Sequence, residues 1–422
     1  MGIVQWMNSI AEFGEWAAGR KPVTKKEDAL RFGILGAANI APVALIIPAR
    51  SHADVIVVAV AARDRKKAET YAKRWGIPIV HDSYDALIND PSIDCIYNPL
   101  PNGLHYRYTL AALKAGKHVL LEKPSLSNAE EARSLFHHSV LSAPKAPVLL
   151  EASHYRFHPA WRLFRAQFNK EDAEDVESRA GLFAGAFDSS DIRWNYDLAG
   201  GATMDLGHYA LSALRGAFGT EPTKVTSATA RLRDPPYDRC DEAMTATYTF
   251  PNGGRGRMSA DLGTRGGYWF PWLTSRWPSF RDCLASVTVR TQPQALGSEN
   301  GLEKSEQKMV KFTNFMGPHG WHRIAVTTTT TLSDPTSGNP VKKTRSTEKK
   351  TAYTFPEVTA SKGEEWWSTY RYMLEEFVNK VKGREGSGAW IDGEESIRQM
   401  EANDRTYEKA GMLVRPTCKE LE

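Results

Sequence analysis

Short apolar runs alternate with amphipathic stretches in the first third of the chain. The run Val55–Ala61 is apolar and β-branched, as expected of a strand buried on both faces of a parallel sheet. The stretch Lys66–Trp75 has helical periodicity and is followed by Gly76, a helix stop signal. Further strands are predicted at 31–35, 93–97, 118–121 and 148–150, and further helices at 39–50, 104–115 and 129–138. This alternation predicts an α/β domain with a doubly wound parallel sheet.

Beyond about residue 160, strand-like runs follow one another with few helices between them. These runs cover 223–232, 244–250, 255–262, 285–291, 309–312 and 324–331. They predict an α+β domain with a large, mostly antiparallel sheet. Helices are predicted at 202–218, 364–382 and 394–410. Residues 333–350 lack large apolar groups and are predicted to form a mobile surface insertion.

The composition is that of an ordinary globular protein. The 422 residues include 54 Lys and Arg against 50 Asp and Glu, and the net charge of +4 is too small for a dedicated nucleic-acid binder. The four cysteines form no CxxC pair, and no apolar run reaches the roughly 18 residues of a membrane span. We therefore expect a soluble cytoplasmic protein with neither nucleic-acid nor membrane partners. No metal site is expected, because the histidines at 154, 158, 319 and 322 lack carboxylates at ligand spacing.

The turn after the first strand has the pattern of a dinucleotide-binding loop. Its sequence, GAANIA, stands where G-x-G-x-x-G/A is expected, with Gly36 making the tight turn and Ala41 allowing close helix–strand packing. Ala38 replaces the glycine that normally lets the backbone approach a pyrophosphate. The N–H groups around Ala38, Asn39 and Ile40 are the expected phosphate donors. A plain strand–turn–helix of small residues is the alternative interpretation.

The end of the second strand favours NADP over NAD. NAD sites usually place Asp or Glu here for the ribose hydroxyls, but Ala62 holds that position. Arg63 follows it, and Lys67 lies in the first turn of the next helix, where basic groups suit a 2′-phosphate. NAD remains possible if Asp64 turns inward, and these basic residues can also form a simple solvated helix face.

Two segments carry candidate catalytic groups. Lys123 follows the strand 118–121, at the carboxyl edge where open parallel sheets bind ligands, and Pro124 restricts it to an extended backbone. Asp205 and Tyr209 are four residues apart on a predicted helix and therefore share a face. A solvated loop lysine is the plainer interpretation of Lys123 taken alone.

Several motifs occurring together identify a family. The stretches FGILGAANIAP, VAARDRKKAETYA, HVLLEKP, HYRFHPAW and GGATMDLGHYALSALR follow one another in this order. With them the chain resembles the glucose–fructose oxidoreductase / inositol dehydrogenase / MocA (Gfo/Idh/MocA) family of NAD(P)-dependent oxidoreductases. Within it, the chain is most similar to D-xylose-type sugar 1-dehydrogenases using NADP and to dihydrodiol dehydrogenases, because Tyr209 stands where many relatives have His.

The resemblance implies specific catalytic roles. Lys123 is expected to bind the reacting oxygen, Tyr209 to act as general acid/base, and Asp205 to orient the substrate or this pair. We expect the Lys123 ammonium to lower the pKa of the Tyr209 phenol, which ordinarily titrates near 10. His208 is a rival for the acid/base role, with a polar core group as its plainer interpretation.

The resemblance also implies binding residues. Along the cofactor it places Pro99, Leu100, Asn102, His105 and Glu122. At the substrate it places Arg156 and, less directly, Tyr155 and His208. A structural salt bridge is the alternative for Arg156, and a helix cap is the alternative for Asn102. The loop 271–277, which contains two tryptophans, is a candidate aromatic wall.

Together these features predict an extension at 1–30, a dinucleotide-binding Rossmann domain at 31–152 and a substrate and oligomerisation domain at 153–422. The expected activity is hydride transfer between the nicotinamide of NADP, with NAD as the alternative cofactor, and a secondary alcohol, hemiacetal or ketone carbon. A sugar resembling D-xylose or D-glucose, or a diol, is the expected substrate. The alternatives are a ketoreductase of secondary metabolism and a non-catalytic NAD(P)-sensing regulator. An exposed apolar face of the second sheet would pair copies into a homodimer or larger homo-oligomer.

Overall fold

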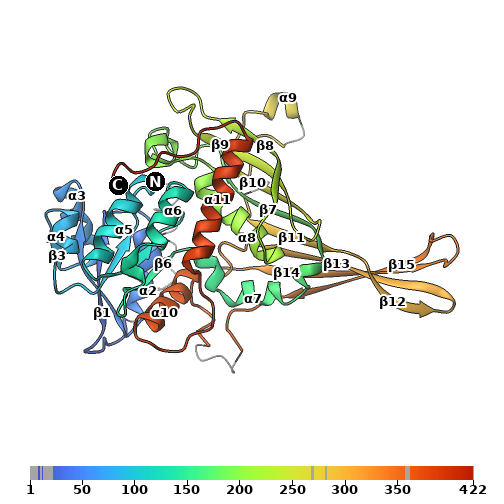
Figure 1. Cartoon of the computed structure of the whole chain (residues 1–422), viewed down its shortest axis with the longest axis horizontal. Coiled ribbons are helices and arrows are strands. Elements are labelled where there is room, and N and C mark those ends of the chain that lie inside the picture. Colours follow the sequence, from blue (N-terminus) through green and yellow to red (C-terminus); the bar gives the residue numbers. More distant parts are fainter. Residues whose placement is uncertain are drawn as a thin grey trace.

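The computed structural model describes residues 8–9, 12, 22–267, 270–280, 283–356 and 362–421. Within these residues the first domain contains six parallel strands in the order β3-β2-β1-β4-β5-β6 (Figure 1). The strands are β1 (Leu30–Leu35), β2 (Val55–Ala61), β3 (Ile79–His81), β4 (Cys95–Asn98), β5 (His118–Leu121) and β6 (Leu149–Glu151). The helices are α3 (Arg65–Trp75), α4 (Tyr84–Ile88), α5 (His105–Lys114) and α6 (Ala129–Phe136). The prediction of a doubly wound parallel sheet is confirmed.

The helix predicted at 39–50 is present, and it runs through Pro48 without a break. It starts with a π-helical turn, η1 (Pro42–Ile46), and continues as α2 (Ile47–Arg50). The N–H of Ile47 donates to the carbonyl of Pro42. Pro48 has no N–H to donate, and the wider turn before it absorbs this gap without ending the helix.

The second domain is built on a large, mostly antiparallel sheet, as predicted. In the described part of the chain nine strands take part, eight of them in the order β15-β14-β13-β11-β7-β10-β9-β8, while β12 pairs with β13. The strands are β7 (Ala173–Phe183), β8 (Lys224–Leu232), β9 (Asp241–Thr249), β10 (Arg255–Thr264), β11 (Ser286–Thr291), β12 (Gln294–Glu299), β13 (Leu302–Thr313), β14 (Arg323–Ser333) and β15 (Pro340–Lys350). The helices α7 (Pro159–Arg165), α8 (His208–Phe218) and α9 (Pro271–Thr274) accompany them.

One face of this sheet is apolar and covered, and the other is polar. Met244, Met258 and Val287 are buried in one cluster with Leu211 of α8. The opposite face carries threonines, serines and charged residues, with cross-strand ion pairs such as Arg255–Asp175. The predicted exposed apolar face is therefore not found on the described strands.

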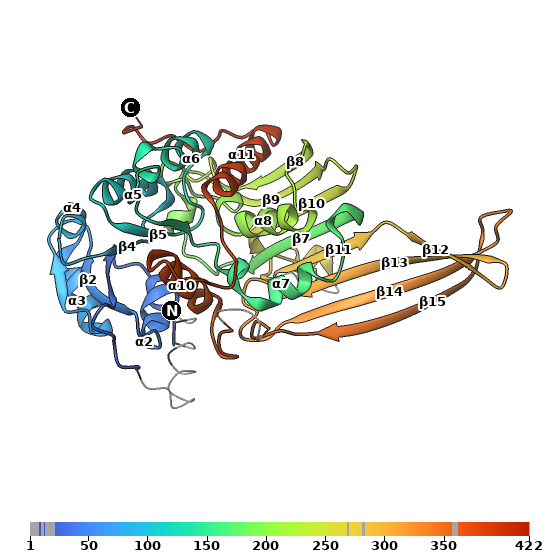
Figure 2. The same ribbon diagram turned by 60° about the horizontal axis from the view of Figure 1, so that its bottom comes forward.

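Strands β12 to β15 form a long arm that projects from the body (Figures 1 and 2). The predicted mobile insertion at 333–350 is wrong, because β15 pairs with β14 along most of its length. Every residue from Pro340 to Lys349 is exposed. Solvent-facing strands need no large apolar side chains, and the threonine-rich β14 supplies the β-branched residues that favour pairing.

The C-terminal helices join the two domains. Helix α10 (Thr369–Val381) packs against the first sheet, with the Phe377 ring centroid 5.9 Å from that of Phe32. Helix α11 (Gly393–Lys409) lies between the domains and contacts both α6 and α8 (Figure 2). The segment 153–422 is therefore not a self-contained unit, because part of its C-terminal region completes the core of the first domain.

Most of the predicted extension at 1–30 lies outside the described residues. Among those described, Asn8 is buried and its side-chain amide donates to the carbonyl of Asn39, 2.8 Å away. None of the described helices is long and apolar enough to cross a membrane.

Candidate active site

Candidate catalytic groups from both domains converge between the two sheets. Lys123 follows β5, Asp205 lies in the π-helical segment η8 (Thr203–Gly207), and Tyr209 lies in α8. Lys123 Nζ is 2.5 Å from Asp205 Oδ1 and 4.6 Å from the centroid of the Tyr209 ring. The structure therefore brings together the three residues to which sequence reasoning gave catalytic roles.

The start of the catalytic helix is held by a buried ion pair. Asp241 accepts hydrogen bonds from the backbone N–H and the hydroxyl of Thr203, both at 2.7 Å. Its other oxygen pairs with Arg415 at 2.7 Å, and both side chains are fully buried. Gly201, at φ +126°, leaves room for this pair, since a Cβ there would lie 2.1 Å from Asp241 Oδ1. The C-terminal tail thus fixes the position of η8.

Asp205 lies between two cations. Its second oxygen accepts a hydrogen bond from Arg193 Nε at 2.6 Å, while Arg193 also pairs with Asp191. Burial alone would raise the pKa of the Asp205 carboxyl, but Lys123 and Arg193 together hold it below its ordinary value. Sequence reasoning missed Arg193, because it lies in the irregular segment η6 (Ile192–Trp194) and no periodicity relates it to the helix.

The Tyr209 hydroxyl is engaged by a histidine that sequence reasoning considered only as a metal ligand. It lies 2.8 Å from Nε2 of His154, which belongs to the short turn η4 (His154–Phe157). The other ring nitrogen, Nδ1, lies 2.8 Å from the Thr369 hydroxyl at the start of α10. Tyr370 packs against the other side of this arrangement, with its ring centroid 4.0 Å from that of His154.

The predicted lowering of the Tyr209 pKa is wrong for this arrangement. Burial, with the negative charges of nearby groups, raises the pKa of this phenol well above its ordinary value. Lys123 lies over the face of the ring and its ammonium is paired with Asp205. The ammonium therefore does not offset the burial of the hydroxyl.

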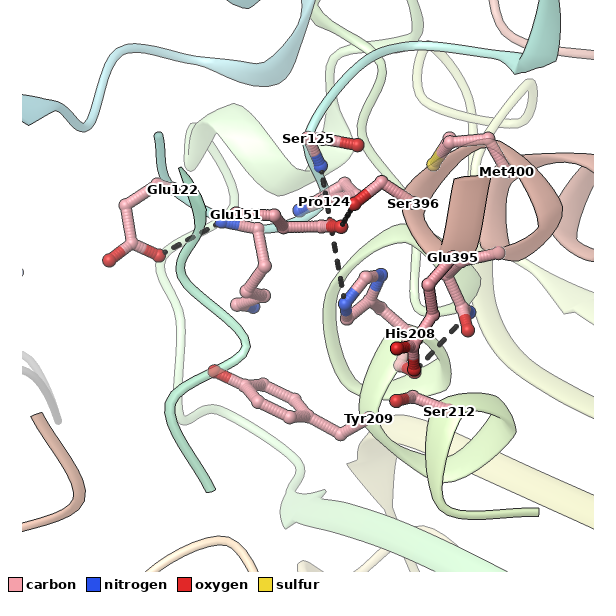
Figure 3. A network of polar contacts seen from close by, with 12 residues as sticks. Glu122, Pro124, Ser125, Glu151, His208, Tyr209, Ser212, Glu395, Ser396 and Met400 are labelled. Atoms are coloured by element: carbon pink, nitrogen blue, oxygen red, sulfur yellow. Dashed lines mark hydrogen bonds and ion pairs between the residues drawn. The ribbon is translucent and has the colours of Figure 1, made fainter. Parts of the chain in front are cut away.

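His208 and Tyr209 occupy different surroundings although they are adjacent in sequence. Figure 3 shows His208 turned toward Glu151, with Tyr209 below it on another side of the helix. His208 Nε2 is 3.5 Å from Glu151 Oε1, and Glu151 accepts hydrogen bonds from the Ser125 N–H and the Ser396 hydroxyl. Burial lowers the pKa of His208 and raises that of Glu151. His208 is thus placed as a polar core group rather than as a rival acid/base.

Two residues predicted along the cofactor, Glu122 and His105, instead brace the loops that carry the site. Glu122 is buried and accepts hydrogen bonds from the Tyr97 hydroxyl at 2.7 Å and from the Lys123 N–H at 3.2 Å. The fully buried His105 ring lies within 3.0 Å of the carbonyls of Leu100 and Pro124. Their side chains are therefore occupied within the protein.

Asn102 joins the two domains. Its amide donates to the carbonyl of Ala199 at 2.9 Å, next to the turn that precedes η8. It lies in the 3₁₀ turn η2 (Asn102–Leu104) and does not cap α5, whose N-cap is Leu104. The capping alternative is therefore wrong.

The predicted substrate residues are mostly occupied elsewhere. Tyr155 is fully buried and its hydroxyl lies 2.9 Å from that of Ser212. Arg156 forms an ion pair with Glu395, which is the structural salt bridge considered as the alternative. In the loop proposed as an aromatic wall, Trp272 and Trp277 are exposed to solvent.

The loop after β1 fits a phosphate-bearing ligand. Gly36 has φ +88° and donates to the carbonyl of Ala61. The N–H groups of Ala38, Asn39 and Ile40 have no hydrogen-bond acceptor among the described residues. Unpaired N–H groups before a helix are suitable donors to phosphate oxygens. Leu100 borders this loop, since a Cβ on Gly36 would lie 3.2 Å from its side chain, and Pro99 is buried beside it.

The acidic residue that follows β2, Asp64, is engaged as the cap of the next helix. The Asp64 side chain caps α3 by accepting the N–H of Lys67. Arg63 and the Lys67 ammonium are exposed, and neither side chain has an ion-pair partner among the described residues. This arrangement leaves positive charge available where the adenosine end of a dinucleotide is expected.

No group of three or more His, Cys, Asp or Glu side chains placed to hold a metal ion occurs in the described part of the chain. The four cysteines all have free thiols.

Residues 30–140 match a family described as an oxidoreductase family with an NAD-binding Rossmann fold, and residues 161–280 match the GFO/IDH/MocA C-terminal domain. The chain is 36% identical over 246 residues to D-xylose 1-dehydrogenase (NADP(+)) 2 of Haloferax volcanii, over 56% of this chain and 70% of that protein. It is 32% identical over 242 residues to trans-1,2-dihydrobenzene-1,2-diol dehydrogenase of Mus musculus, over 56% and 69% of the two chains.

The fold is also shared with a 3-ketoreductase from Actinomadura kijaniata solved in complex with NADP and TDP-benzene. The TM-score is 0.66 at 19% identity, over 90% of this chain and 98% of that chain. At this identity the likeness concerns the fold alone.

Proposed function

The chain belongs to the GFO/IDH/MocA oxidoreductase family, and from this premise we propose that it is an NADP-dependent dehydrogenase or reductase acting on a sugar, a diol or a related ketone. The observation that carries the proposal is the convergence of Lys123 and Tyr209, with Lys123 Nζ 4.6 Å from the centroid of the Tyr209 ring. An amine and a phenol at the edge of a dinucleotide fold suit proton transfer to or from a reacting oxygen.

In this proposal the nicotinamide supplies the hydride chemistry when the cofactor is bound. The protein positions the reacting carbon and manages the hydroxyl proton. Lys123 donates a hydrogen bond to the reacting oxygen and stabilises negative charge that develops there. Tyr209 exchanges the proton with the same oxygen. Asp205, shared between Lys123 and Arg193, orients the ammonium.

The test is to replace Lys123 with Met and to measure NADP-dependent turnover on a panel of aldoses and diols. We expect kcat/KM to fall about a hundredfold or more, because the donor to the developing charge is lost. Lys114→Met, at an exposed lysine near the end of α5, is the matched control. Unchanged turnover in the Lys123 variant would refute the assignment.

NADP is proposed as the cofactor because Arg63 is available for a 2′-phosphate while Asp64 is committed to a helix cap. Replacing Arg63 with Ala is expected to raise the KM for NADP about tenfold and to leave the KM for NAD nearly unchanged. Lys66→Ala, at an exposed cation in the first turn of α3, is the control. Equal effects on both cofactors would contradict this assignment.

A ketoreductase acting on a secondary metabolite is the second candidate. A similarity of 34% identity over 199 residues to the dTDP-3,4-didehydro-2,6-dideoxy-alpha-D-glucose 3-reductase of Streptomyces violaceoruber supports keeping it. A substrate panel that includes aromatic and polyketide ketones separates the two candidate functions. Preference for sugars or diols favours the first candidate, and preference for these ketones favours the second. A cofactor-sensing regulator has no chemical need for Lys123, Asp205 and Tyr209 together, and turnover on any substrate of the panel excludes that role.

A further inference from the structure

The Tyr209 phenol has a buried partner whose chemistry is unused in the function proposed above. His154 is 5% exposed, and its ring stacks on Tyr370 with centroids 4.0 Å apart. Its two nitrogens each meet one hydroxyl, Tyr209 at Nε2 and Thr369 at Nδ1, both at 2.8 Å. Since Thr369 is fully buried, the chain Tyr209–His154–Thr369 is closed to solvent at its Thr369 end, and a proton can enter or leave it through the Tyr209 hydroxyl.

We propose that His154 is a positioning residue for Tyr209, and that it takes up and returns the phenol proton during turnover. This inference rests on the proposed function of the site and adds a residue to it.

The hydrogen-bond directions follow from the groups present. A neutral imidazole donates from one nitrogen and accepts at the other. If Nδ1–H donates to the Thr369 hydroxyl, Nε2 accepts from the Tyr209 O–H. The Tyr209 oxygen then keeps its lone pairs for the substrate hydroxyl. Thr369 thereby fixes the tautomer that Tyr209 needs.

The proton balance closes on these side chains. In alcohol oxidation the substrate O–H bond breaks and its proton binds the Tyr209 oxygen. The Tyr209 proton moves at the same time to Nε2 of His154. Tyr209 gains one proton and loses one, so it never becomes a buried phenolate, and His154 becomes an imidazolium that donates from both nitrogens. When the product has left, the two transfers reverse, and the proton passes through the Tyr209 hydroxyl to the water that replaces the product. In the reduction direction every transfer runs in reverse.

On this path Tyr209 passes one proton on as it receives another, so the phenol does not have to ionise. Burial raises the pKa of Tyr209 and lowers that of His154, so that both are neutral near neutral pH. A phenol that passes its proton on needs no lowered pKa. The titratable and charged groups that act on His154 from the surrounding elements are Lys123, His158, His208, Tyr209, His319 and Tyr370.

The first test separates proton transfer from mere support. In His154→Gln the amide can still bond to the Tyr209 hydroxyl but cannot accept a proton. We expect kcat to fall about thirtyfold while KM changes less than threefold. Near wild-type kcat in this variant would overturn the proposal, because a purely structural role survives the replacement. His137→Gln, at an exposed histidine paired with Glu394, is the matched control.

A second pair of variants tests whether the Thr369 hydroxyl fixes the tautomer of His154. Thr369→Val keeps the side-chain shape and removes the hydroxyl, and we expect kcat to fall about fivefold. Thr369→Ser restores the hydroxyl and should restore kcat. Equal kcat values in the Thr369→Val and Thr369→Ser variants would show that the hydroxyl does not act through His154.

A third measurement does not depend on activity. Side-chain ¹⁵N shifts of His154 in the cofactor-free protein should show a protonated Nδ1 and an unprotonated Nε2, and Tyr209→Phe should shift the Nε2 resonance. A protonated Nε2, or an Nε2 resonance indifferent to Tyr209, would overturn the inference. Failure of the wild-type protein to turn over any substrate would instead count against the proposed function alone.

Discussion

At the scale of single residues, the site is organised by the carboxylate of Asp205. One oxygen binds Lys123 at 2.5 Å and the other binds Arg193 at 2.6 Å. Two cations on one carboxylate limit how strongly it holds either of them. The Lys123 ammonium therefore remains able to donate to a substrate oxygen while its position is still fixed.

Removing Arg193 should disturb this division of charge. In Arg193→Ala the carboxylate is left to Lys123 alone, which binds the ammonium more tightly and weakens its hydrogen bond to substrate. We expect kcat to fall about tenfold with a smaller change in cofactor affinity, measured by steady-state kinetics. Arg239→Ala, an exposed arginine stacked on Tyr196, serves as the control. Unaltered kcat would show that Asp205 does not govern Lys123.

The sequence predicted the parts of the site that motifs mark. Lys123 follows a readable strand, and Asp205 and Tyr209 lie on a readable helix. His154 and Arg193 lie in short irregular turns, where neither periodicity nor spacing indicates a direction. Their partners are Tyr209 and Asp205. The roles of His154 and Arg193 can therefore be inferred only from the three-dimensional structure, which brings them into contact with these partners. The same holds for Arg156, whose partner Glu395 lies far along the chain.

At the scale of elements, α11 is docked onto α6 through a carboxyl group in an unfavourable environment. Asp404 accepts the N–H of Ala129 at 2.8 Å, but its other oxygen has no hydrogen-bond partner. Burial, together with the charges of Glu408 and Glu401, raises the pKa of Asp404 to about 7. The folded protein therefore holds a proton that the unfolded chain has already released above about pH 4.

This raised pKa sets the sign of a stability prediction. Because the folded state binds more protons, the free energy of unfolding falls as pH rises from about 4 to about 7. In Asp404→Asn the Ala129 N–H keeps its acceptor and the charge is absent. We expect Tm to rise by about 2–4 °C at pH 8 and to change little at pH 4.5, as measured by calorimetry. A stabilisation of equal size at both pH values would contradict this account.

Periodicity predicted the elements with one consistent apolar face and failed for elements that depend on their neighbours. Strand β7 was missed because its open face carries charged residues, and these are paired only after β10 is placed beside it, as in Arg257–Asp175. Strand β15 was missed because it is solvated on both faces and carries no apolar signal. The short β3 and α4 gave too few residues for a period.

At the scale of the whole molecule, the second sheet leaves one broad face uncovered by any described element. Its core side packs on α8, while Thr245 and Ser259 are cross-strand neighbours on the other side. We propose that a second copy of the chain covers this face, through polar side chains rather than through the apolar surface that the sequence suggested. A polar face can serve this purpose, since a whole non-obligate interface is only about as apolar as the rest of a protein surface.

An arginine on this face, in β9 next to the edge strand β8, should weaken the assembly. We expect Thr245→Arg to shift the sedimentation coefficient from that of a dimer or larger oligomer toward that of a monomer. Thr344→Arg, on the opposite side of the sheet in the arm, should leave the coefficient unchanged. A wild-type protein that sediments as a monomer at every concentration would refute the proposed assembly.

The central claim is that Lys123 and Tyr209 act together on one substrate oxygen beside the nicotinamide. A crystal structure with NADP and a bound sugar or diol tests this most directly. We predict that Lys123 Nζ and the Tyr209 hydroxyl both lie within about 3.2 Å of the same substrate oxygen, with the carbon that bears it facing the nicotinamide ring. A substrate held on another wall of the cleft, with neither group in reach of its reacting oxygen, would contradict the account.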